Sequence, residues 1–571
     1  MQPPDPLTDS VARMIETACT WRDHDPDPAT RAELTRLIEA ADTGDPAAVA
    51  DLDSRFRGPL TFGTAGLRGE VGAGETRMNV AVVLRATHGL ARHLIDTVGP
   101  DARVVVGCDA RHGSDDFLDA TAEVLAAQGL TVMTLPRRLP TPVTAYATRA
   151  LDCDAGVMIT ASHNPSADNG YKVYLGGRAT DSAGRGVQIV PPADEQIATF
   201  IDAAPRADQI ARDPAAVVAL DETVLDAYIA RTASLRPASL RPGDEPSTVR
   251  VVLTPMHGVG GTTALAVLRA AGVADLHAVD EQFAPDPDFP TVAFPNPEEP
   301  GALDRALELA RDVDAHVVIA LDPDADRCSV ATPTEDGWRQ LTGDEIGWLL
   351  GEQAARDPGR GGDTLACSIV SSRLLAKIAA HHGLRSAVTL TGFKWIARTP
   401  DLRFGYEEAI GYCTDPDAVR DKDGISAMVR VVSLVEELAA DGRTLVDLLD
   451  DLARRHGLHA TAPLTIRVDD LAELGQMMDR LRSTQIDALA GSAIVEVLDL
   501  ARGSGDLPPT DALVLRTAAD DRVIVRPSGT EPKLKCYLEV VLDCAGGEIP
   551  HARAAQRLQA ISADVAALLQ R

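Results

Sequence analysis

The segment His316-Val-Val-Ile-Ala-Leu-Asp-Pro-Asp-Ala-Asp-Arg327 joins an apolar run to three acidic residues. The run His316–Leu321 is typical of a buried strand. Asp322, Asp324 and Asp326 follow at alternate positions, so an extended backbone would project their carboxylates to one side. Unpaired carboxylates would repel one another, and all-oxygen ligands favour Mg²⁺, Mn²⁺ or Ca²⁺. This place at the end of a strand predicts a metal site rather than a solvated acidic loop.

Strand-like apolar runs alternate with alanine-rich, helix-like segments along the whole chain, which predicts an α/β fold. Strands are expected at 103–107, 155–160, 249–255, 316–321, 364–370 and 521–525, and helices at 81–97, 116–128, 262–271, 302–312 and 425–441. Proline-rich or polar stretches mark domain boundaries. They predict four domains at 1–205, 206–335, 336–455 and 456–571.

A second expected strand ends in Thr160-Ala-Ser-His-Asn-Pro165. Ser162 and His163 thus stand at the carboxyl end of a strand, where α/β sheets bind ligands. Neighbouring residues rarely form a productive hydrogen bond, and a plain turn uses the same residue types. A nucleophilic serine and a simple turn therefore both remain open from spacing alone. Lys172 follows ten residues after Ser162 and can return to the same site.

Three further loops carry candidate binding groups. Phe62-Gly-Thr-Ala-Gly-Leu-Arg-Gly69 contains small residues and Arg68. Arg526-Pro-Ser-Gly-Thr-Glu-Pro-Lys-Leu-Lys535 offers a guanidinium, two hydroxyls and two ammonium groups, which suits a phosphate. Gly405-Tyr-Glu-Glu-Ala-Ile-Gly411 holds two acids that either accept hydrogen bonds from sugar hydroxyls or are merely solvated.

Composition excludes several classes of protein. The 571 residues carry a formal net charge of −30, which argues against nucleic acid and anionic membranes as partners. No apolar run has the ~18–20 residues of a membrane span, and the first residues do not resemble a secretory signal, so a cytoplasmic location is expected. The eight cysteines form no CxxC pair, which argues against structural zinc and against a disulfide framework. No lysine follows a glycine, which excludes a P-loop.

Taken in order, these loops resemble the α-D-phosphohexomutase superfamily over nearly the whole chain. Further segments resemble its branch of phosphoglucomutase-2-type enzymes, phosphomannomutases and phosphopentomutases. These segments are Trp21-Arg-Asp-His-Asp-Pro-Asp-Pro28, Thr254-Pro-Met-His-Gly-Val-Gly260, Thr391-Gly-Phe-Lys-Trp395 and Arg420-Asp-Lys-Asp-Gly424. Five of the six lysines, all but Lys377, fall in the motif segments. Because Lys and Arg are not equivalent at a site, this concentration of the lysines in the motif segments indicates a functional use.

The resemblance implies four domains around a central cleft: three α/β domains with mixed sheets and a C-terminal α+β domain like the TATA-binding protein. It implies that Ser162 carries the phosphoryl group and is a further ligand of Mg²⁺ on Asp322, Asp324 and Asp326. It also implies roles for the remaining site residues. Arg68, His163 and Lys172 are expected at the phosphoserine, Lys172 as general acid/base; Arg327, Thr391 and Lys422 on the substrate path; Glu407 at sugar hydroxyls; and Arg526, Ser528, Gly529 and Thr530 at the non-reacting phosphate.

The expected activity is therefore interconversion of glucose or mannose 1-phosphate with the 6-phosphate, through a phosphoserine and an activating 1,6-bisphosphate. A phosphopentomutase and a sugar-bisphosphate synthase are alternatives within the resemblance. A metal-dependent phosphatase and a binding protein without turnover are alternatives outside it. Many relatives have serine where this chain has Ala409, so weak selection among sugar epimers is expected. The sequence does not indicate an oligomeric state.

Overall fold

The computed structural model describes residues 6–240, 247–357, 361–468, 471–505, 507–528 and 533–570. The chain divides into two compact units. The first unit comprises Met1–Ala331 and Asp415–Glu436, and the second comprises Thr332–Thr414 and Glu437–Arg571. No helix in the described ranges is long and apolar enough to cross a membrane.

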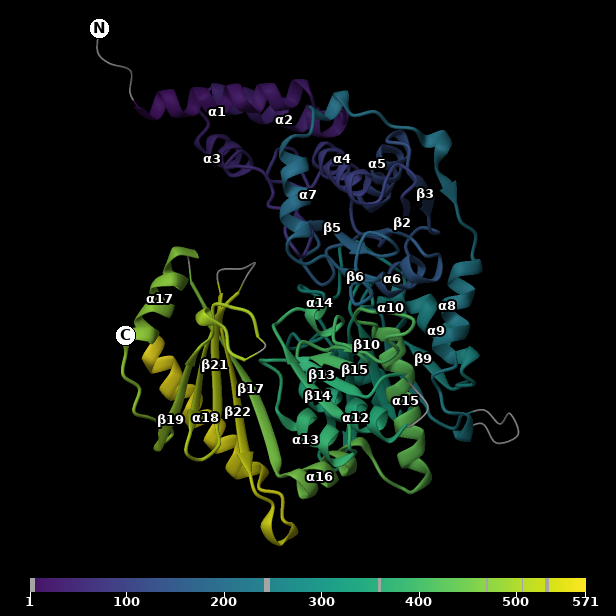
Figure 1. Ribbon diagram of the computed structural model, residues 1–571, viewed down its shortest axis with the longest axis vertical. Coiled ribbons are helices and arrows are strands. Elements are labelled where there is room, and N and C mark those ends of the chain that lie inside the picture. The colour runs from purple at the N-terminus through teal and green to yellow at the C-terminus, as the bar shows by residue number, and fades with distance from the viewer. Residues whose placement is uncertain are drawn as a thin grey trace. The chain divides into compact units, whose positions relative to one another are not determined.

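The first unit begins with three helices, α1 (Pro6–Asp23), α2 (Pro28–Asp42) and α3 (Pro46–Arg55), drawn in purple in Figure 1. The sequence analysis did not single out these helices. Asp27 and Asp45 each precede a proline, and their side chains accept a hydrogen bond from the first turn of α2 and of α3. These N-caps satisfy backbone donors that a helix start otherwise leaves free.

A mixed sheet follows, with the strand order β1-β5-β4-β2-β3-β7 and with β6 paired to β5. Its strands are β1 (Leu67–Glu70), β2 (Arg103–Cys108), β3 (Thr131–Thr134), β4 (Ala155–Ile159), β5 (Asp168–Leu175), β6 (Val187–Gln188) and β7 (Val218–Ala219). Strands β4, β2, β3 and β7 are parallel, whereas β5 is antiparallel to β4. Helices α4 (Val80–Thr97) and α5 (Ser114–Ala127) lie on one side of this sheet and α6 (Thr141–Ala150) on the other (Figure 1). Helix α7 (Ala193–Asp202) packs on α4.

A second mixed sheet has the order β12-β11-β10-β8-β9. Its strands are β8 (Val251–Thr254), β9 (Leu276–Ala278), β10 (Val317–Leu321), β11 (Cys328–Thr334) and β12 (Gly337–Gln340), and its helices are α8 (Thr223–Ala233), α9 (Gly260–Ala270), α10 (Asp280–Phe283) and α11 (Asp304–Asp312). Strand β11 runs antiparallel to β10, so the chain reverses between them. The acidic triplet lies in this reversal. Helix α15 (Gly424–Ala440) begins in the returning segment of the first unit.

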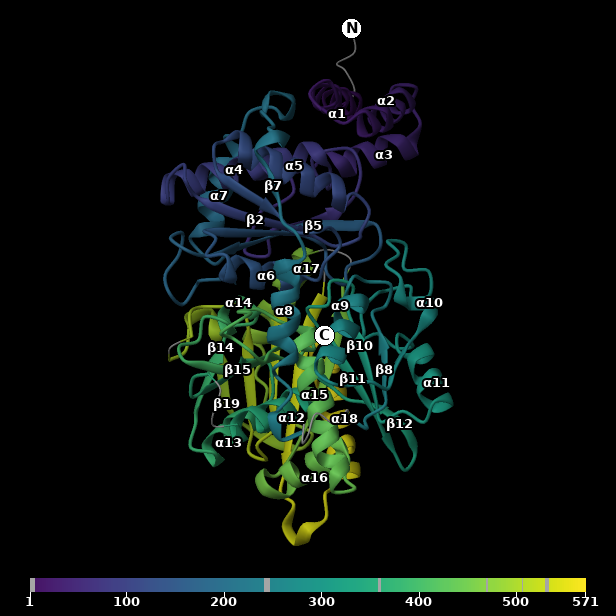
Figure 2. The same cartoon turned by 90° about the vertical axis from the view of Figure 1, so that its right-hand side faces the viewer.

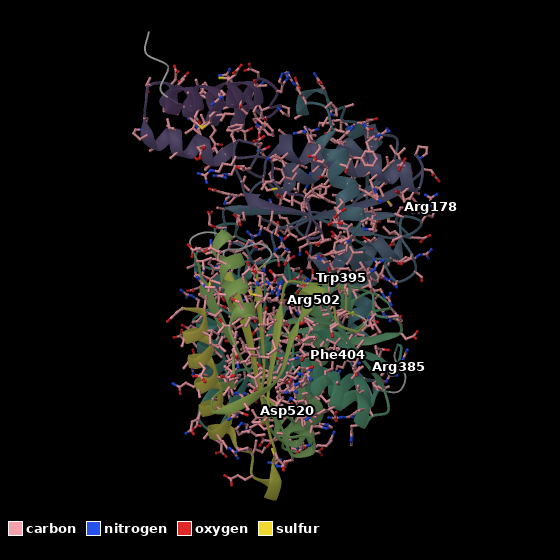
Figure 3. The ribbon with its side chains drawn as sticks, turned by 60° about the vertical axis from the view of Figure 1, so that its left-hand side comes forward. Arg178, Arg385, Trp395, Phe404, Arg502 and Asp520 are labelled. Atoms are coloured by element: carbon pink, nitrogen blue, oxygen red, sulfur yellow. The ribbon has the colours of Figure 1, made fainter. Side chains whose placement is uncertain are left out.

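The second unit contains the mixed sheet β14-β13-β15-β16. Its elements are β13 (Thr364–Ser368), β14 (Arg385–Thr389), β15 (Leu402–Glu407), β16 (Gly411–Cys413), α12 (Gly343–Arg356), α13 (Leu374–His381), α14 (Phe393–Ile396) and α16 (Leu445–His456). Phe404 stacks on Tyr406 with 6.2 Å between ring centroids, and both rings are buried. Figure 3 shows Phe404 inside this part of the unit and Arg385 at its surface.

The C-terminal part is an antiparallel sheet of order β17-β22-β21-β20-β19-β18 with two helices. Its elements are β17 (Leu458–Arg467), β18 (Ala488–Leu489), β19 (Ser492–Asp499), β20 (Leu513–Thr517), β21 (Arg522–Pro527), β22 (Lys533–Leu542), α17 (Leu471–Ser483) and α18 (His551–Leu569). Met478 of α17 and Ile561 of α18 share a core with Val523 and Leu538 of the sheet. This sheet and α18 are also visible in Figure 2.

Every strand and helix that the sequence analysis named coincides with an observed element to within a few residues. The α/β class and the mixed sheets are confirmed. The four domain boundaries stay a prediction.

Candidate active site

Ser162 lies in the first turn after β4, where the parallel strand ends. Its backbone φ is 53°, in the left-handed region that residues with a Cβ rarely adopt. Its backbone N–H donates to Thr160 Oγ1 at 2.9 Å, and its side chain is only 2% exposed. The Ser162 hydroxyl therefore has a fixed position in a buried turn.

Arg111 holds this turn from the end of β2, the strand next to β4. Its guanidinium donates to four backbone oxygens, those of Ser162 at 2.6 Å, Asn164 at 2.6 Å, Pro165 at 2.7 Å and Asp168 at 3.0 Å. The planar five-donor group of arginine suits such a fan of carbonyls. The sequence analysis missed Arg111, although its place after a parallel strand could have marked it.

Asp322, Asp324 and Asp326 are fully buried, and one oxygen of each lies within 4.8 Å of the others. The expectation of an extended backbone here is wrong. Ala325 N donates to Asp322 O at 2.8 Å and Ala325 has a φ of 56°, so the segment is a tight turn. The carboxylates converge because the chain reverses into antiparallel β11, not because alternate residues share a face.

Two neighbouring segments hold this turn through backbone hydrogen bonds. Val259 N donates to Pro323 O at 2.8 Å, and a Cβ on Gly258 would lie 2.3 Å from the Pro323 backbone. Gly424 N donates to Ala325 O at 3.2 Å. The segments around Gly258 and Gly424, which the sequence analysis noted as motifs, thus position the acidic turn.

The donor set fits a divalent cation. Asp324 Oδ1 and Asp326 Oδ1 are buried and have no hydrogen-bond partner among the described residues. A buried carboxylate oxygen without a partner is costly unless a cation completes it. Ser162 Oγ donates to Asp322 Oδ2 at 3.0 Å, so the serine stands at the edge of the same cluster. Oxygen ligands of this kind suit a hard ion such as Mg²⁺.

Two lysines compensate the acidic cluster. Lys172 Nζ lies 2.8 Å from Asp324 Oδ2 and 3.0 Å from Asp326 Oδ2, and Lys422 Nζ lies 3.1 Å from Asp326 Oδ2. Burial opposes ionisation of Asp326, but the two ammonium groups outweigh it and hold its pKa well below the usual range. Burial and the two neighbouring carboxylates raise the pKa of Asp322 well above its usual range.

The structure also brings Arg68, His163 and Arg327 to this centre. Arg68 lies in β1 opposite Gly170 of β5, and Arg327 N donates to Asp322 Oδ1 at 2.9 Å. His163 Nδ1 lies 3.3 Å from Ser162 Oγ. Burial, with the nearby guanidiniums of Arg327 and Arg68, lowers the pKa of His163 well below its ordinary value. A neutral imidazole can share the serine proton without adding charge.

Thr391 and Glu407 lie in the second unit. Thr391 follows β14, Glu407 is the last residue of β15, and both are half-buried. The adjacent Glu408 accepts hydrogen bonds from Ser368 Oγ at 3.0 Å and Ser371 Oγ at 2.9 Å. Glu408 therefore braces the loop and is not merely solvated.

The phosphate-type loop begins at the end of β21 in the second unit. Arg526 pairs in register with Lys535 of β22, which brings two cations side by side on the sheet. Ser528 N donates to Lys533 O at 2.8 Å. Gly529 and Thr530 lie outside the described residues.

Comparison with known proteins tests the resemblance directly. Models of the phosphoglucomutase/phosphomannomutase family match residues 59–206, 226–337 and 342–456 as alpha/beta/alpha domains I, II and III, and residues 465–556 as the C-terminal domain. A probable phosphomannomutase of Haemophilus influenzae is 45% identical over 81% of this chain and 93% of its own length.

The chain belongs to the phosphoglucomutase/phosphomannomutase family. A probable phosphoribomutase of Schizosaccharomyces pombe is 34% identical over 92% of this chain and 93% of its own. The crystal structure of a putative phosphomannomutase from Thermus thermophilus has a TM-score of 0.69 at 24% identity and covers 89% of this chain and 99% of that one, a likeness of fold. The expected superfamily and the expectation of an enzyme of the phosphotransferase isomerase type are confirmed. The individual site residues and the domain boundaries stay predictions.

Proposed function

We propose that this family member interconverts hexose 1-phosphates and 6-phosphates, with glucose and mannose as the sugars, and that Ser162 carries the phosphoryl group. The observation that carries the proposal is the buried contact of 3.0 Å between Ser162 Oγ and Asp322 Oδ2, at the cluster of three aspartates. A hydroxyl held beside a cation site is the arrangement that phosphoryl transfer requires.

In the proposed reaction, phospho-Ser162 transfers its phosphoryl group to the free hydroxyl of the sugar phosphate. As the new P–O bond to the sugar forms, the bond between phosphorus and Ser162 Oγ breaks; the sugar hydroxyl gives up its proton, the serine oxygen takes one up, and a 1,6-bisphosphate results. The bisphosphate turns over, and its other phosphoryl group returns to Ser162. Positioning and stabilisation of charge dominate the rate because the transition state is loose. Arg68, His163 and Lys172 supply the charge and the proton relay, with Lys172 as the candidate acid/base.

We assign Asp322, Asp324 and Asp326 as ligands of Mg²⁺, with the Ser162 phosphate as a further ligand. When bound, the ion would polarise the transferring phosphoryl group. The unpartnered oxygens of Asp324 and Asp326 support this assignment. A sugar 1,6-bisphosphate would act as activator, since it restores phospho-Ser162 after loss of the phosphate to water.

Recognition falls to the remaining predicted residues. Glu407 would accept hydrogen bonds from sugar hydroxyls; Arg327, Thr391 and Lys422 would line the substrate path; and Arg526, Ser528, Gly529 and Thr530 would hold the non-reacting phosphate. The pairing of Arg526 with Lys535 supports the phosphate site. The alanine at position 409 supplies no hydroxyl next to Glu407 and Glu408.

Pentose 1-phosphates are a second candidate substrate. The similarity to the probable phosphoribomutase over nearly the full length of both chains supports this candidate. A ring hydroxyl bound by one neutral hydrogen bond contributes only ~0.5–1.5 kcal/mol, which is roughly 2–13-fold in affinity. The absence of that bond at Ala409 is expected to leave the enzyme tolerant of different sugars.

A panel of sugar 1-phosphates tests the substrate, with Mg²⁺ and a trace of bisphosphate present. We expect turnover of both glucose and mannose 1-phosphates and no stoichiometric release of free phosphate, which a phosphatase would show. Ala409→Ser should change the ratio of kcat/KM between sugars by less than about tenfold, and Glu407→Ala should cost more because a charged acceptor is worth ~1.5–3 kcal/mol. A preference above about a thousandfold for one hexose epimer would contradict the tolerance, since such bonds are too weak to supply it.

A further inference from the structure

A separate cavity of about 600 Å³ lies in the first unit, away from the aspartate cluster. Helix α1 forms one wall, helix α4 a second, and the segment that follows α7 a third. The α1 wall precedes the residues 59–206 that the first family domain matches, whereas the other two walls lie largely within them. None of the candidate active-site residues lines this cavity. Figure 2 shows α1 beside α2 at one end of the unit.

The cavity is positively charged in an acidic protein. Three arginines line it, Arg13, Arg85 and Arg206, against one acid, Glu16. The whole chain has a net charge of −30, so a local surplus of guanidinium groups opposes the overall field. Planar guanidinium groups bind phosphate oxygens in pairs, which makes arginine the preferred residue for phosphate.

Two buried donors on the cavity wall lack an acceptor. Trp21 Nε1 and Arg85 Nε are buried, and neither has a hydrogen-bond partner among the described residues. Among the described residues, only Nη2 of Arg85 has a protein acceptor, Ile201 O, at the long distance of 3.4 Å. Buried donors without a partner are rare and cost free energy. Both nitrogens are closed off from solvent, so the polar groups that a ligand in the cavity would meet are the guanidinium groups of the exposed Arg13 and Arg206.

The other lining residues provide flat, apolar surface. Trp21 and Pro205 contribute rings to the wall. The alanines Ala81, Ala204 and Ala207 have short side chains that leave space for a ligand. The other ring beside Trp21 is Phe56, which meets it edge to face with 6.3 Å between centroids. A tryptophan at a cation-lined cavity suits a ligand that combines a planar ring with an anion.

We propose that this cavity binds a mononucleotide, with its phosphate at the three arginines and its base against Trp21. A volume of about 600 Å³ is in the ordinary range for sites of small organic ligands. His24 stands at the rim, where its Nδ1 lies 3.0 Å from Asp208 Oδ2 and its Nε2 contacts Arg206. This contact holds the Arg206 guanidinium at the cavity. The inference concerns binding alone and does not depend on the proposed function.

Isothermal titration calorimetry of the full-length protein tests the site, with AMP, ADP, inorganic phosphate and ribose 5-phosphate as probes. The titrations are done without Mg²⁺ and are repeated with Asp324→Asn, which leaves the cavity unchanged, so that binding at the aspartate cluster is recognised separately. We expect AMP or ADP to bind at least tenfold more tightly than phosphate or ribose 5-phosphate. Equal affinity for a probe without a base would overturn the nucleotide assignment, and no heat with any nucleotide at millimolar concentration would overturn the site.

Variants locate the binding. Arg85→Gln should weaken nucleotide binding at least tenfold, whereas Arg92→Gln, at an exposed position two turns further along the same helix that does not line the cavity, should leave it within twofold. Trp21→Phe keeps a ring but reduces the area on which a base can stack, so a smaller loss of two- to fivefold is expected. Should Arg85→Gln lower the thermal midpoint, the exposed Arg13→Gln gives the same test on α1. Unchanged affinity in Arg85→Gln or in Arg13→Gln, as well as equal losses in Arg85→Gln and Arg92→Gln, would place the nucleotide elsewhere.

Discussion

Ser162 and the three aspartates of the first unit are at most 2% exposed, whereas Glu407 and Arg526 of the second unit are half-buried. The first region is a buried cluster of charges, in which the aspartates contact Ser162, Lys172 and Lys422 at 2.8–3.1 Å. The second consists of strand ends whose charged side chains, Glu407 and Arg526, are partly exposed to solvent. Under the proposed function the difference would correspond to two tasks: transfer of a phosphoryl group needs fixed charges and exclusion of water, and recognition of a sugar needs groups that a substrate can reach.

Loss of one aspartate should have the largest effect after loss of Ser162 itself. Asp324→Asn removes one anionic ligand with little change of shape, while Thr141 Oγ1, which lies 2.7 Å from Asp324 Oδ2, can still donate to the amide oxygen. We expect turnover to fall by about a hundredfold or more and the Mg²⁺ requirement to rise, because the ion loses charge from its ligand set. Steady-state rates over a Mg²⁺ titration measure both quantities.

The matched control is Asp312→Asn, an exposed acid at the end of α11 in the same unit. It should retain the rate and the metal requirement. An Asp324→Asn enzyme with the wild-type rate and the wild-type Mg²⁺ dependence would place the metal away from the triplet.

A smaller effect is expected from the arginine that holds the serine turn. Arg111→Lys keeps the charge but cannot reach four carbonyls at once, so the Ser162 hydroxyl loses its fixed position. We expect kcat to fall roughly 10–100-fold with little change in KM, since small displacements of reacting groups cost rate and not substrate binding.

Arg178→Lys is the control for this change. Arg178 lies at the surface of the same unit (Figure 3) and pairs with Asp101 and Asp154. Replacement of its planar guanidinium by an ammonium group should leave kcat within about twofold. A rise in KM without a fall in kcat for Arg111→Lys would show that Arg111 acts on substrate binding and not on the serine.

The third prediction concerns the stability of the second unit. Burial raises the pKa of Asp344 to about 7, although Ser372 N and Tyr406 OH donate to its carboxylate. An acid with a raised pKa binds its proton more tightly in the folded state. Its contribution to stability is therefore full below pH ~4 and is lost as the pH rises through about 7.

Asp344→Asn should flatten this decline, which we expect to be a few kcal/mol between pH 4 and 7. The amide oxygen can still accept from Ser372 and Tyr406. Calorimetric unfolding across this pH range measures the slope, and Asp441→Asn, an exposed acid of the same unit, should leave it unchanged. A wild-type slope in Asp344→Asn would show that another group sets the pH dependence.

The sequence predicted the strand-end loops well because each has a local signal, an apolar run followed by chemically unusual residues. Ser162, Asp322, Asp324 and Lys172 come together as expected, although β4 and β10 belong to different sheets and Lys172 reaches the aspartates from within β5. Arg111 was not predicted because its partners are backbone oxygens more than fifty residues away, although its position after a parallel strand was an available local signal.

The backbone conformation of the acidic turn could not be predicted from the sequence either. Alternate spacing of Asp322, Asp324 and Asp326 looks the same in an extended strand and in a turn, and the left-handed Ala325 that decides it carries no turn signature. The cavity beside Trp21 was invisible for a similar reason, since α1, α4 and the segment after α7 meet only in the folded unit.

The central claim is that Ser162 carries the phosphoryl group, and labelling tests it most directly. The purified protein would be incubated with glucose 1,6-bisphosphate labelled in its phosphates, digested, and analysed by mass spectrometry together with Ser162→Ala and Ser166→Ala, the next serine in the same turn. We expect one phosphate per chain on Ser162 in the wild type and in Ser166→Ala, and neither label nor mutase turnover in Ser162→Ala. Label on another residue, or turnover that persists in Ser162→Ala, would contradict the account.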